Sequence, residues 1–254
     1  MRRNIKYLVI IILLIFSIAC SSSIETSNLG PEERLAIAMK YYETEDYLEA
    51  IKEFEAILLQ FPASGVNDDA IFYLGMSRFN RKEYILAAYE FSKLIKSLSS
   101  SEYLSKSQFM LAECYYNLSP NFSLDQRYSK KAIQEFQAFV DFFPLDEKVS
   151  EAETKILELN QKLAKKEFES ARIYEKMEYT TAALFYYDNV IQIYHDTEYA
   201  PLAHYNKLNI LLNKKRFSEA LETAKSFISN YPDNSRTAEV QKILNDLEKE
   251  FTSN

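Results

Sequence analysis

The chain has 254 residues and a net charge of −7; 47% of its residues are hydrophobic and only three are glycine. So few glycines argue against an all-β fold or a doubly wound α/β fold, because both use glycine at turns and phosphate-binding loops. The acidic balance argues against nucleic acid as a partner and against electrostatic attraction to anionic lipid. The composition instead favours an all-α protein with enough apolar residues for a core.

The N-terminal segment has the order of parts typical of a bacterial export signal. Three basic residues come within the first six, an apolar run occupies 7–18, and Cys20 follows Ala19. This order predicts cleavage before Cys20. The segment resembles a bacterial lipoprotein signal, which implies acylation of the Cys20 thiol. We predict a signal over 1–19 and a flexible, polar tether over 20–33. An uncleaved helical anchor is the alternative, although the run is short for a membrane span.

After the tether, one pattern of small and apolar residues occurs five times. A small residue in the second helix of each copy is followed, four and seven residues later, by apolar and mostly aromatic side chains. The small residues are Ala50, Ala87, Ala132, Ala183 and Ala220, and the matching first-helix positions are Ala38, Gly75, Ala112, Ala171 and Leu208. A frame of about 34 residues with small residues at helix crossings is typical of tetratricopeptide (TPR) repeats.

The predicted fold is therefore an all-α solenoid of five TPR-type helix pairs. Proline, which cannot continue a helix, ends the second helix of three pairs, at Pro62, Pro144 and Pro232. Apolar residues then keep a helical period without glycine or proline, which predicts one long helix from about Glu147 to about Met177. This helix joins repeats 1–3, over 34–146, to repeats 4–5, and it opens the second part of the chain, 147–252.

The third pair carries eight additional residues between its two helices. We expect this insertion, 117–129, to fold on itself. Asp125 is expected to accept a backbone N–H in the turn, and Gln126 to bridge a donor and an acceptor. The expected apolar anchors are Leu118, Phe122, Leu124 and Tyr128. Two interpretations stay open: a self-packed loop that stiffens the repeat, and a loop that also contacts a partner.

The sequence holds no motif of a catalytic, cofactor or metal site. The two histidines, His195 and His204, are interpreted as exposed turn residues, and Cys114 as a small buried core residue. Because no pocket of titratable groups is indicated, we predict a binding protein rather than an enzyme, with no catalytic residue, metal or cofactor.

Aromatic residues are abundant, with 19 tyrosines and 17 phenylalanines. In three tyrosine pairs, at 41–42, 115–116 and 186–187, one member is expected in the core and the other toward a groove or solvent. Tyrosine gives contact area at low entropic cost, so a concave surface for an extended or helical segment is expected. The candidate partner-binding residues are Tyr41, Tyr42, Tyr73, Tyr116, Phe122, Asp125 and Gln126.

The third pair also carries a family resemblance. Its residues are Ser119-Pro120, Leu124-Asp125-Gln126, Ala132-Ile133, Phe136-Gln137, Phe139 and Pro144. Together with the signal, Cys20 and the five repeats, they resemble the BamD family, the outer-membrane assembly lipoproteins of Gram-negative bacteria.

The resemblance implies a lipid-anchored subunit on the periplasmic face of the outer membrane, in the machinery that assembles β-barrel proteins. Its implied partners are a BamA-like barrel protein, bound through the C-terminal repeats, other assembly-machinery subunits, and unfolded outer-membrane proteins, received by the N-terminal repeats. The alternative is a cell-envelope adaptor of the Tol–Pal or peptidoglycan-coordination type, because such adaptors share the repeats.

Overall fold

The structure is a computed structural model that describes residues 29–252. Within that range all regular structure is helical. The helices are α2 (Pro31–Glu43), α3 (Tyr47–Gln60), α4 (Asn67–Asn80), α5 (Tyr84–Ser97), α6 (Leu104–Leu118), α7 (Arg127–Phe142), α8 (Val149–Lys176), α9 (Thr180–Ile193), α10 (Tyr199–Asn213), α11 (Phe217–Asn230) and α12 (Thr237–Thr252). The predicted signal, Cys20 and most of the predicted tether lie outside the described residues.

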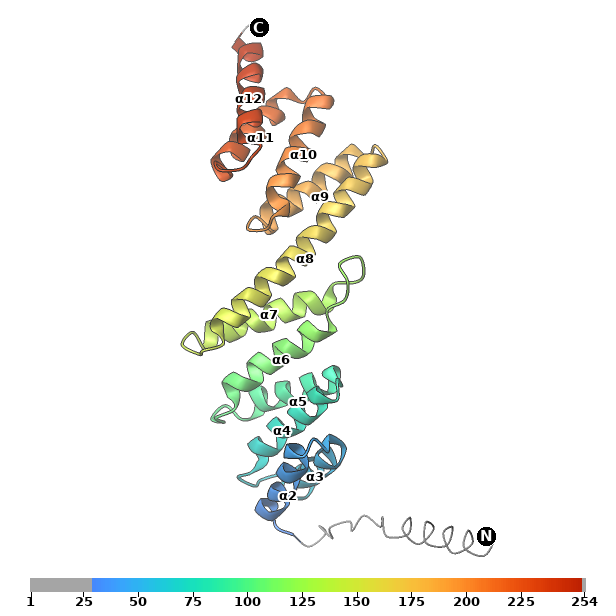
Figure 1. The fold of residues 1–254 in the computed structure, drawn as a ribbon, viewed down its shortest axis with the longest axis vertical. Helices are drawn as coiled ribbons and strands as arrows, with labels where there is room; N and C mark the ends of the chain where they lie inside the picture. The colour runs from blue at the N-terminus through green and yellow to red at the C-terminus, as the bar shows by residue number, and fades with distance from the viewer. Residues whose placement is uncertain (1–28, 253–254) are drawn as a thin grey trace, which may run out of the picture.

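The helices stack in chain order into an elongated solenoid, with α2 at one end and α12 at the other (Figure 1). Each helix packs mainly on its neighbours in sequence, as expected of a repeat protein. The pairs α2–α3, α4–α5, α6–α7, α8–α9 and α10–α11 confirm the predicted all-α, TPR-type fold. The predicted long helix is α8, of 28 residues, which packs first on α7 and then on α9. The division into two parts at residue 147 stays a prediction.

The small residues of the repeat frame lie at the helix crossings. All five second-helix alanines are fully buried, and the apolar residues four and seven positions later are at most 1% exposed. Gly75 shows how tight one crossing is, because a Cβ atom there would lie 2.7 Å from a ring carbon of Phe91. The Phe91 ring is itself fully buried, so even an alanine at position 75 would overpack this crossing.

The second helices end in one geometry, whether or not proline follows. The residues after the last helical turn, Phe61 and Phe143, stand before proline and have φ of −128°. Leu98 stands before serine and has φ of −130°. The repeat therefore sets this stop by itself, and proline reinforces it by disfavouring helical backbone in the preceding residue.

The tight turns inside four of the pairs are also alike. Each contains one residue with left-handed backbone: Glu45, Lys82, Glu178 and Lys215, with φ of 61°, 62°, 62° and 57°. The next N–H donates back to the preceding helix, as from Glu83 to the carbonyl of Arg78 at 2.9 Å. This is the Schellman ending of a helix, and its left-handed position is usually glycine. The α6–α7 connection, which holds the insertion, is built differently.

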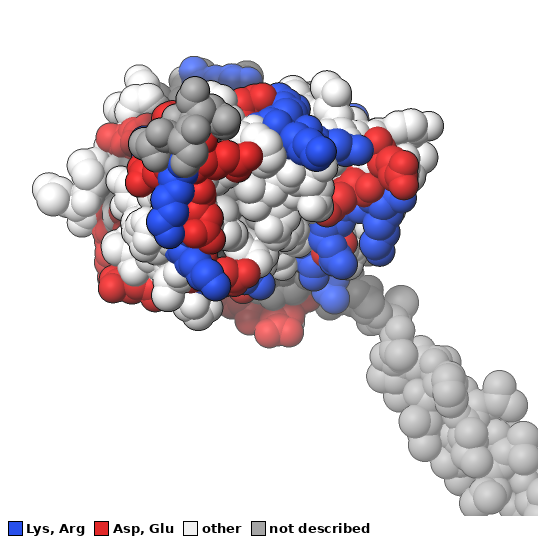
Figure 2. Space-filling model, turned by 90° about the horizontal axis from the view of Figure 1, so that it is seen from above, with Lys and Arg blue, Asp and Glu red and all other residues white. Residues whose placement is uncertain are grey.

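The buried apolar residues form four clusters along the solenoid. Three occupy α2–α4, α4–α6 and α6–α8, and the fourth runs from the second half of α8 to α12. In this last cluster α12 covers α11 with Val240, Leu244 and Leu247. Seen from the α12 end, Lys and Arg side chains lie interspersed with Asp and Glu (Figure 2).

Candidate protein-binding site

An apolar groove opens between α4 and α6, next to the turn between α7 and α8. It is a cavity of about 500 Å³. Its apolar lining is Phe72, Met76, Phe109, Met110 and Phe139, and its polar lining is Ser105, Lys106, Asp146, Glu147 and Lys148. We call it the α4–α6 groove. A mostly apolar cavity with a few charged groups suits an apolar segment of a partner.

Two phenylalanines hold the same place in successive repeats of this groove. Phe72 and Phe109 each stand three residues before the crossing residue of their first helix, so the repeat brings both to one surface. Phe72 stacks on Tyr103 with ring centroids 4.5 Å apart, and Phe109 meets Phe139 edge-on at 5.3 Å. Both rings are buried, with 7% and 4% of their surface exposed, so they form a fixed wall of the groove. The candidate residues predicted from the sequence did not include this position, which occurs in every repeat and does not by itself single out the groove.

A hydrogen-bonded turn places the charges of the α4–α6 groove. Asp146 accepts a hydrogen bond from the Ser105 hydroxyl and one of 3.0 Å from the Lys148 N–H. These bonds hold the pKa of Asp146 below its usual value. Lys148 Nζ lies 4.7 Å from the centroid of the Phe109 ring. The groove therefore combines ring faces with a cation and with a carboxylate that is charged at neutral pH.

Two of the predicted tyrosines connect to this groove without lining it. Tyr73 meets Phe72 edge-on at 5.3 Å between ring centroids, and Tyr42 meets Tyr73 at 5.1 Å. Tyr41 is half-buried against the cluster of α2–α4. Burial is the main cause that raises the pKa of Tyr42, so its phenol is neutral. A row of rings thus leads from α2 to the groove.

Tyr116, also predicted, packs against α8. Its hydroxyl donates a 2.7 Å hydrogen bond to Glu158, and Lys155 Nζ lies 4.9 Å from its ring centroid. Burial, and then the bond to Glu158, raises the pKa of Tyr116 to about 12. In this structure the side chain is therefore engaged within the chain.

Within the insertion, 117–129, Gln126 is the central side chain. Only 5% of Gln126 is exposed. Its amide nitrogen donates to the carbonyls of Asn121 at 2.8 Å and Leu124 at 3.0 Å, and its oxygen accepts from Ser129 Oγ at 2.7 Å. This is the bridging role expected from the sequence. Because the amide is used inside the loop, any effect of Gln126 on a partner depends on the shape that it gives the loop.

Two lysines of α8 hold the insertion from outside. Lys162 Nζ donates to Ser119 Oγ at 2.8 Å, and Lys165 Nζ lies 4.6 Å from the centroid of the half-buried Phe122 ring. The loop is therefore attached to the next repeat as well as folded on itself.

Asp125 and Leu124 lie on the outer side of the loop. Asp125 is exposed, and its Oδ1 accepts the Arg127 N–H at 3.0 Å, which is the expected turn bond. Leu124 was expected as an apolar anchor, and this was wrong, because its side chain is 58% exposed. The loop uses the Leu124 carbonyl instead, which accepts from Gln126 and from Lys166.

The expected division of the tyrosine pairs holds in one pair out of three. Tyr187 is fully buried and Tyr186 half-buried, whereas both members of the pairs at 41–42 and 115–116 are half-buried. The latter tyrosines stand three and four residues after the crossing residue of a first helix. Both positions flank the crossing, so neither is pushed fully into the core or out of it.

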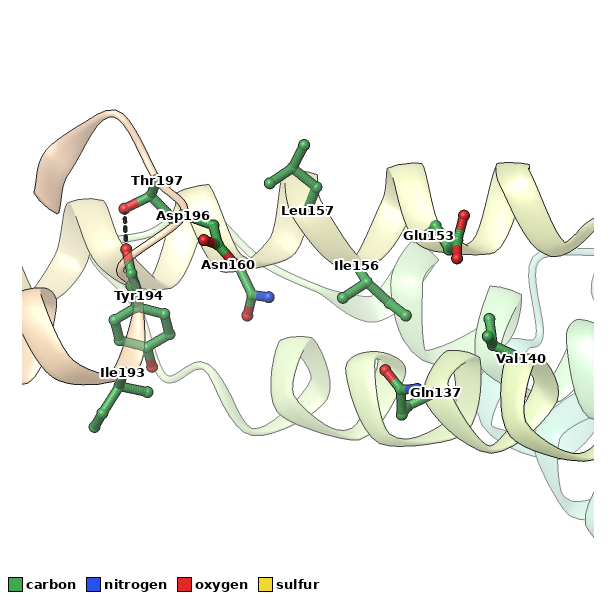
Figure 3. A pocket seen from close by; sticks show the side chains of 10 residues that line it. All are labelled: Gln137, Val140, Glu153, Ile156, Leu157, Asn160, Ile193, Tyr194, Asp196 and Thr197. Atoms are coloured by element: carbon green, nitrogen blue, oxygen red, sulfur yellow. Dashed lines mark hydrogen bonds between the residues drawn. The ribbon is translucent and has the colours of Figure 1, made fainter. Parts of the chain in front are cut away.

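A second cavity, of about 250 Å³, lies where α8 passes from the third pair to the fourth (Figure 3). It is lined by α7, α8 and the turn between α9 and α10. Ile156 and Asn160 point from α8 into the space between these elements. The Thr197 hydroxyl closes the turn by donating to the Tyr194 carbonyl at 2.6 Å. The lining mixes apolar and polar groups, which makes it a weaker candidate for an apolar segment.

The structure places the two histidines differently. His195 is exposed, as predicted, and pairs with the neighbouring carboxylate. His204 is only 3% exposed and lies edge-on to Phe227 and Tyr231, so its prediction as an exposed turn residue was wrong. It stands four residues before the crossing residue Leu208, on the same, buried face of α10. Burial lowers the pKa of His204 to about 4.

The remaining candidates for chemistry are few within residues 29–252. Cys114 is fully buried, as predicted, and burial raises the pKa of its thiol, so the reactive thiolate is disfavoured. In this part of the chain no cluster of three His, Cys, Asp or Glu residues is placed to hold a metal ion. Nor is any of the described helices both long and apolar enough to span a membrane.

Comparisons with known proteins bear on the whole solenoid. The model of the outer membrane lipoprotein family YfiO matches residues 31–216. The outer membrane protein assembly factor BamD of Caulobacter vibrioides is 24% identical over 233 residues, which cover 89% of this chain and 76% of that protein. BamD of Pasteurella multocida is 24% identical, over 82% of this chain and 86% of that protein. Among solved structures, a TPR-repeat protein of Bacteroides fragilis has 11% identity and a TM-score of 0.48, over 87% of this chain and 98% of that one.

Proposed function

The chain belongs to the YfiO family of outer membrane lipoproteins, and from that membership we propose that it is a lipid-anchored scaffold subunit of the machinery that assembles β-barrel proteins in the outer membrane. The observation that carries the proposal is the family match, which covers the first four helix pairs and all of α10. The two relatives named as outer membrane protein assembly factors support it. The proposed role is binding, without a catalytic step.

The proposed anchor is an acylated Cys20, which would hold the protein on the periplasmic face of the outer membrane. A single acyl chain binds a membrane only marginally, so two or three chains are expected. Labelling cells with a clickable fatty acid tests this. The Cys20→Ala variant should take up no label, and Cys114→Ala, which removes the other cysteine, should be labelled as strongly as the wild type. Equal labelling of Cys20→Ala would contradict the anchor.

The proposed role of the α4–α6 groove is to receive unfolded outer-membrane proteins. The strands of such barrels alternate apolar and polar side chains. An extended segment of this kind presents every second side chain to the same side. The groove offers it the half-buried, flexible side chains of Met76 and Met110, which lie beside the buried rings of Phe72 and Phe109. Methionine adapts to partners of different shape, which suits a site that accepts many sequences.

Binding of an unfolded barrel protein, diluted from urea, tests this role. The double variant Met76→Ser and Met110→Ser removes apolar surface from the groove without touching the helix crossings. We expect its affinity to fall by about 10-fold, because two partly buried thioether side chains are lost. The matched control is Leu59→Ser with Leu86→Ser, two exposed leucines on α3 and α5. A loss as large in the control as in the groove variant would contradict the role of the groove.

The proposed membrane partner is a BamA-like barrel protein, with other subunits of the assembly machinery. A tagged pull-down from solubilised membranes tests it, and recovery of a large β-barrel protein is the expected result. Recovery of peptidoglycan-associated proteins in its place would favour an adaptor of the Tol–Pal or peptidoglycan-coordination type and would contradict the assembly role.

A further inference from the structure

We propose that the surface around the insertion is a docking site for an acidic polypeptide segment of a partner protein. The insertion lies against α8 with a hollow on either side, of about 460 Å³ and about 520 Å³. Six cationic side chains line the two hollows: Arg127, Lys130, Lys131, Lys162, Lys165 and Lys166. We call this the basic insertion surface. This proposal goes beyond the assembly role. It rests on that role only because it takes the partner to be a protein.

The five lysines of this surface lack acidic partners. None of them forms an ion pair with a carboxylate in the described part of the chain, and Arg127 has only a 3.8 Å contact with the exposed Asp125. Some lysines elsewhere on the solenoid do pair, as Lys207 does with Asp188 at 2.5 Å. In a chain with a net charge of −7, unpaired cations gathered on one surface leave a local attraction for carboxylates that the chain does not satisfy.

Three of these cations are already held in place. Lys162 is hydrogen-bonded to Ser119, Lys166 to the carbonyl of Leu124, and Lys165 stands over the ring of Phe122. An ammonium group has three donors, so each of these lysines keeps capacity for a carboxylate oxygen. Because their positions are fixed by the loop, less side-chain entropy is lost when a partner binds. The insertion thus orders the cations that it borders.

The details of the surface favour a polypeptide over a phosphate-bearing lipid surface. Carboxylates stand in the same hollows, Asp125 and Glu167 on one side of the loop and Glu198 on the other, and they repel a continuous layer of phosphates. Gln134 and Gln161 also line the hollows. Their amides both donate and accept, which matches a peptide backbone, whereas a phosphate only accepts. The loop separates the two hollows, and a chain can follow such a path where a flat surface cannot.

A fluorescence binding assay tests the proposal, with a labelled peptide of alternating Glu and Ala and the same peptide with Gln in place of Glu. The purified chain should bind the Glu peptide and not the Gln peptide, and added salt should weaken binding. The double variant Lys130→Gln and Lys131→Gln should lose about 5-fold to 10-fold in affinity. The control, Lys214→Gln with Lys242→Gln, removes two exposed lysines elsewhere and should change affinity by less than about 2-fold.

Three results would each overturn the proposal. The first is equal binding of both peptides, and the second is an equal loss of affinity in both lysine variants. The third is that vesicles of phosphatidylglycerol bind more tightly than the Glu peptide and lose that binding in the Lys130→Gln, Lys131→Gln variant, which would make the surface a lipid site. Binding of the unfolded barrel protein should be unchanged in this variant. If the Met76→Ser, Met110→Ser variant binds the unfolded barrel protein as well as the wild type does, while the Glu peptide still binds as expected, only the proposed role of the groove is contradicted.

Discussion

The two halves of the solenoid bury their apolar residues in different ways. From α2 to the first half of α8 the buried residues form three clusters, whereas from the second half of α8 to α12 they form one. The α4–α6 groove lies where two of the three clusters meet, since Phe72 belongs to one and Phe109 and Phe139 to the next. The three rings are buried and form the wall of the groove, so the apolar side chains that stay accessible at this boundary are the half-buried Met76 and Met110.

The largest expected effect comes from overpacking one crossing in each half. Ala87 and Ala183 are both fully buried, and phenylalanine at either position should cost about 3 kcal/mol in unfolding free energy. Ala183→Phe lies in the single cluster, so it should raise hydrogen exchange from the second half of α8 through α12 together. Ala87→Phe should raise it in α4, α5 and α6 first.

Hydrogen exchange read by mass spectrometry, with denaturant unfolding, measures both variants. If Ala87→Phe raised hydrogen exchange equally along the whole solenoid, the separate clusters would not be separate units of stability. If neither variant lost stability, the repeat frame itself would be misassigned.

A second expected effect is confined to the C-terminal cluster and depends on pH. The pKa of His204 is lowered from 6.5 to about 4, chiefly by burial and then by Lys207, with Asp188 opposing. The unfolded chain therefore takes up this proton more readily than the folded chain. The contribution of neutral His204 to the free energy of unfolding is fully present above pH 6.5 and is lost as the pH falls toward 4. Between pH 7 and pH 5 the loss should be about 2 kcal/mol.

Urea unfolding of His204→Phe at both pH values isolates this contribution. Phenylalanine keeps a ring against Phe227 and Tyr231 and has no proton to gain, and the buried Nδ1 of His204 has no hydrogen-bond partner to lose. The variant should lack about 2 kcal/mol of the pH dependence of the wild type. His195→Gln, at the exposed histidine, serves as the control and should keep it. Equal pH dependence in wild type and His204→Phe would show that folding does not lower the pKa of His204.

The repeat frame made most of this fold predictable from the sequence, because each copy has an alanine in its second helix, followed four and seven residues later by apolar and mostly aromatic side chains. Side-chain direction was harder to foresee. His204 shares a buried face with Leu208, whereas the polarity of histidine predicts an exposed turn residue. Leu124 is apolar, yet the loop uses its carbonyl. The α4–α6 groove depends on where two clusters fail to merge, which is a property of three helices and not of one motif.

The smallest expected effect should be the same in both halves, because the tight turns do not differ between them. Lys82 and Lys215 have φ of 62° and 57°, a backbone that costs a residue with a Cβ atom about 1–2 kcal/mol. Glycine removes that cost but makes the unfolded chain more flexible, so Lys82→Gly and Lys215→Gly should each gain about 0.5–1 kcal/mol. Alanine at the same positions keeps the Cβ atom and is the matched control, expected to change stability little. Chemical denaturation of the four variants measures this. A gain in one half only would mean that the halves differ in their turns as well as in their cores, and a loss with glycine would show that the lysine side chains stabilise the turns.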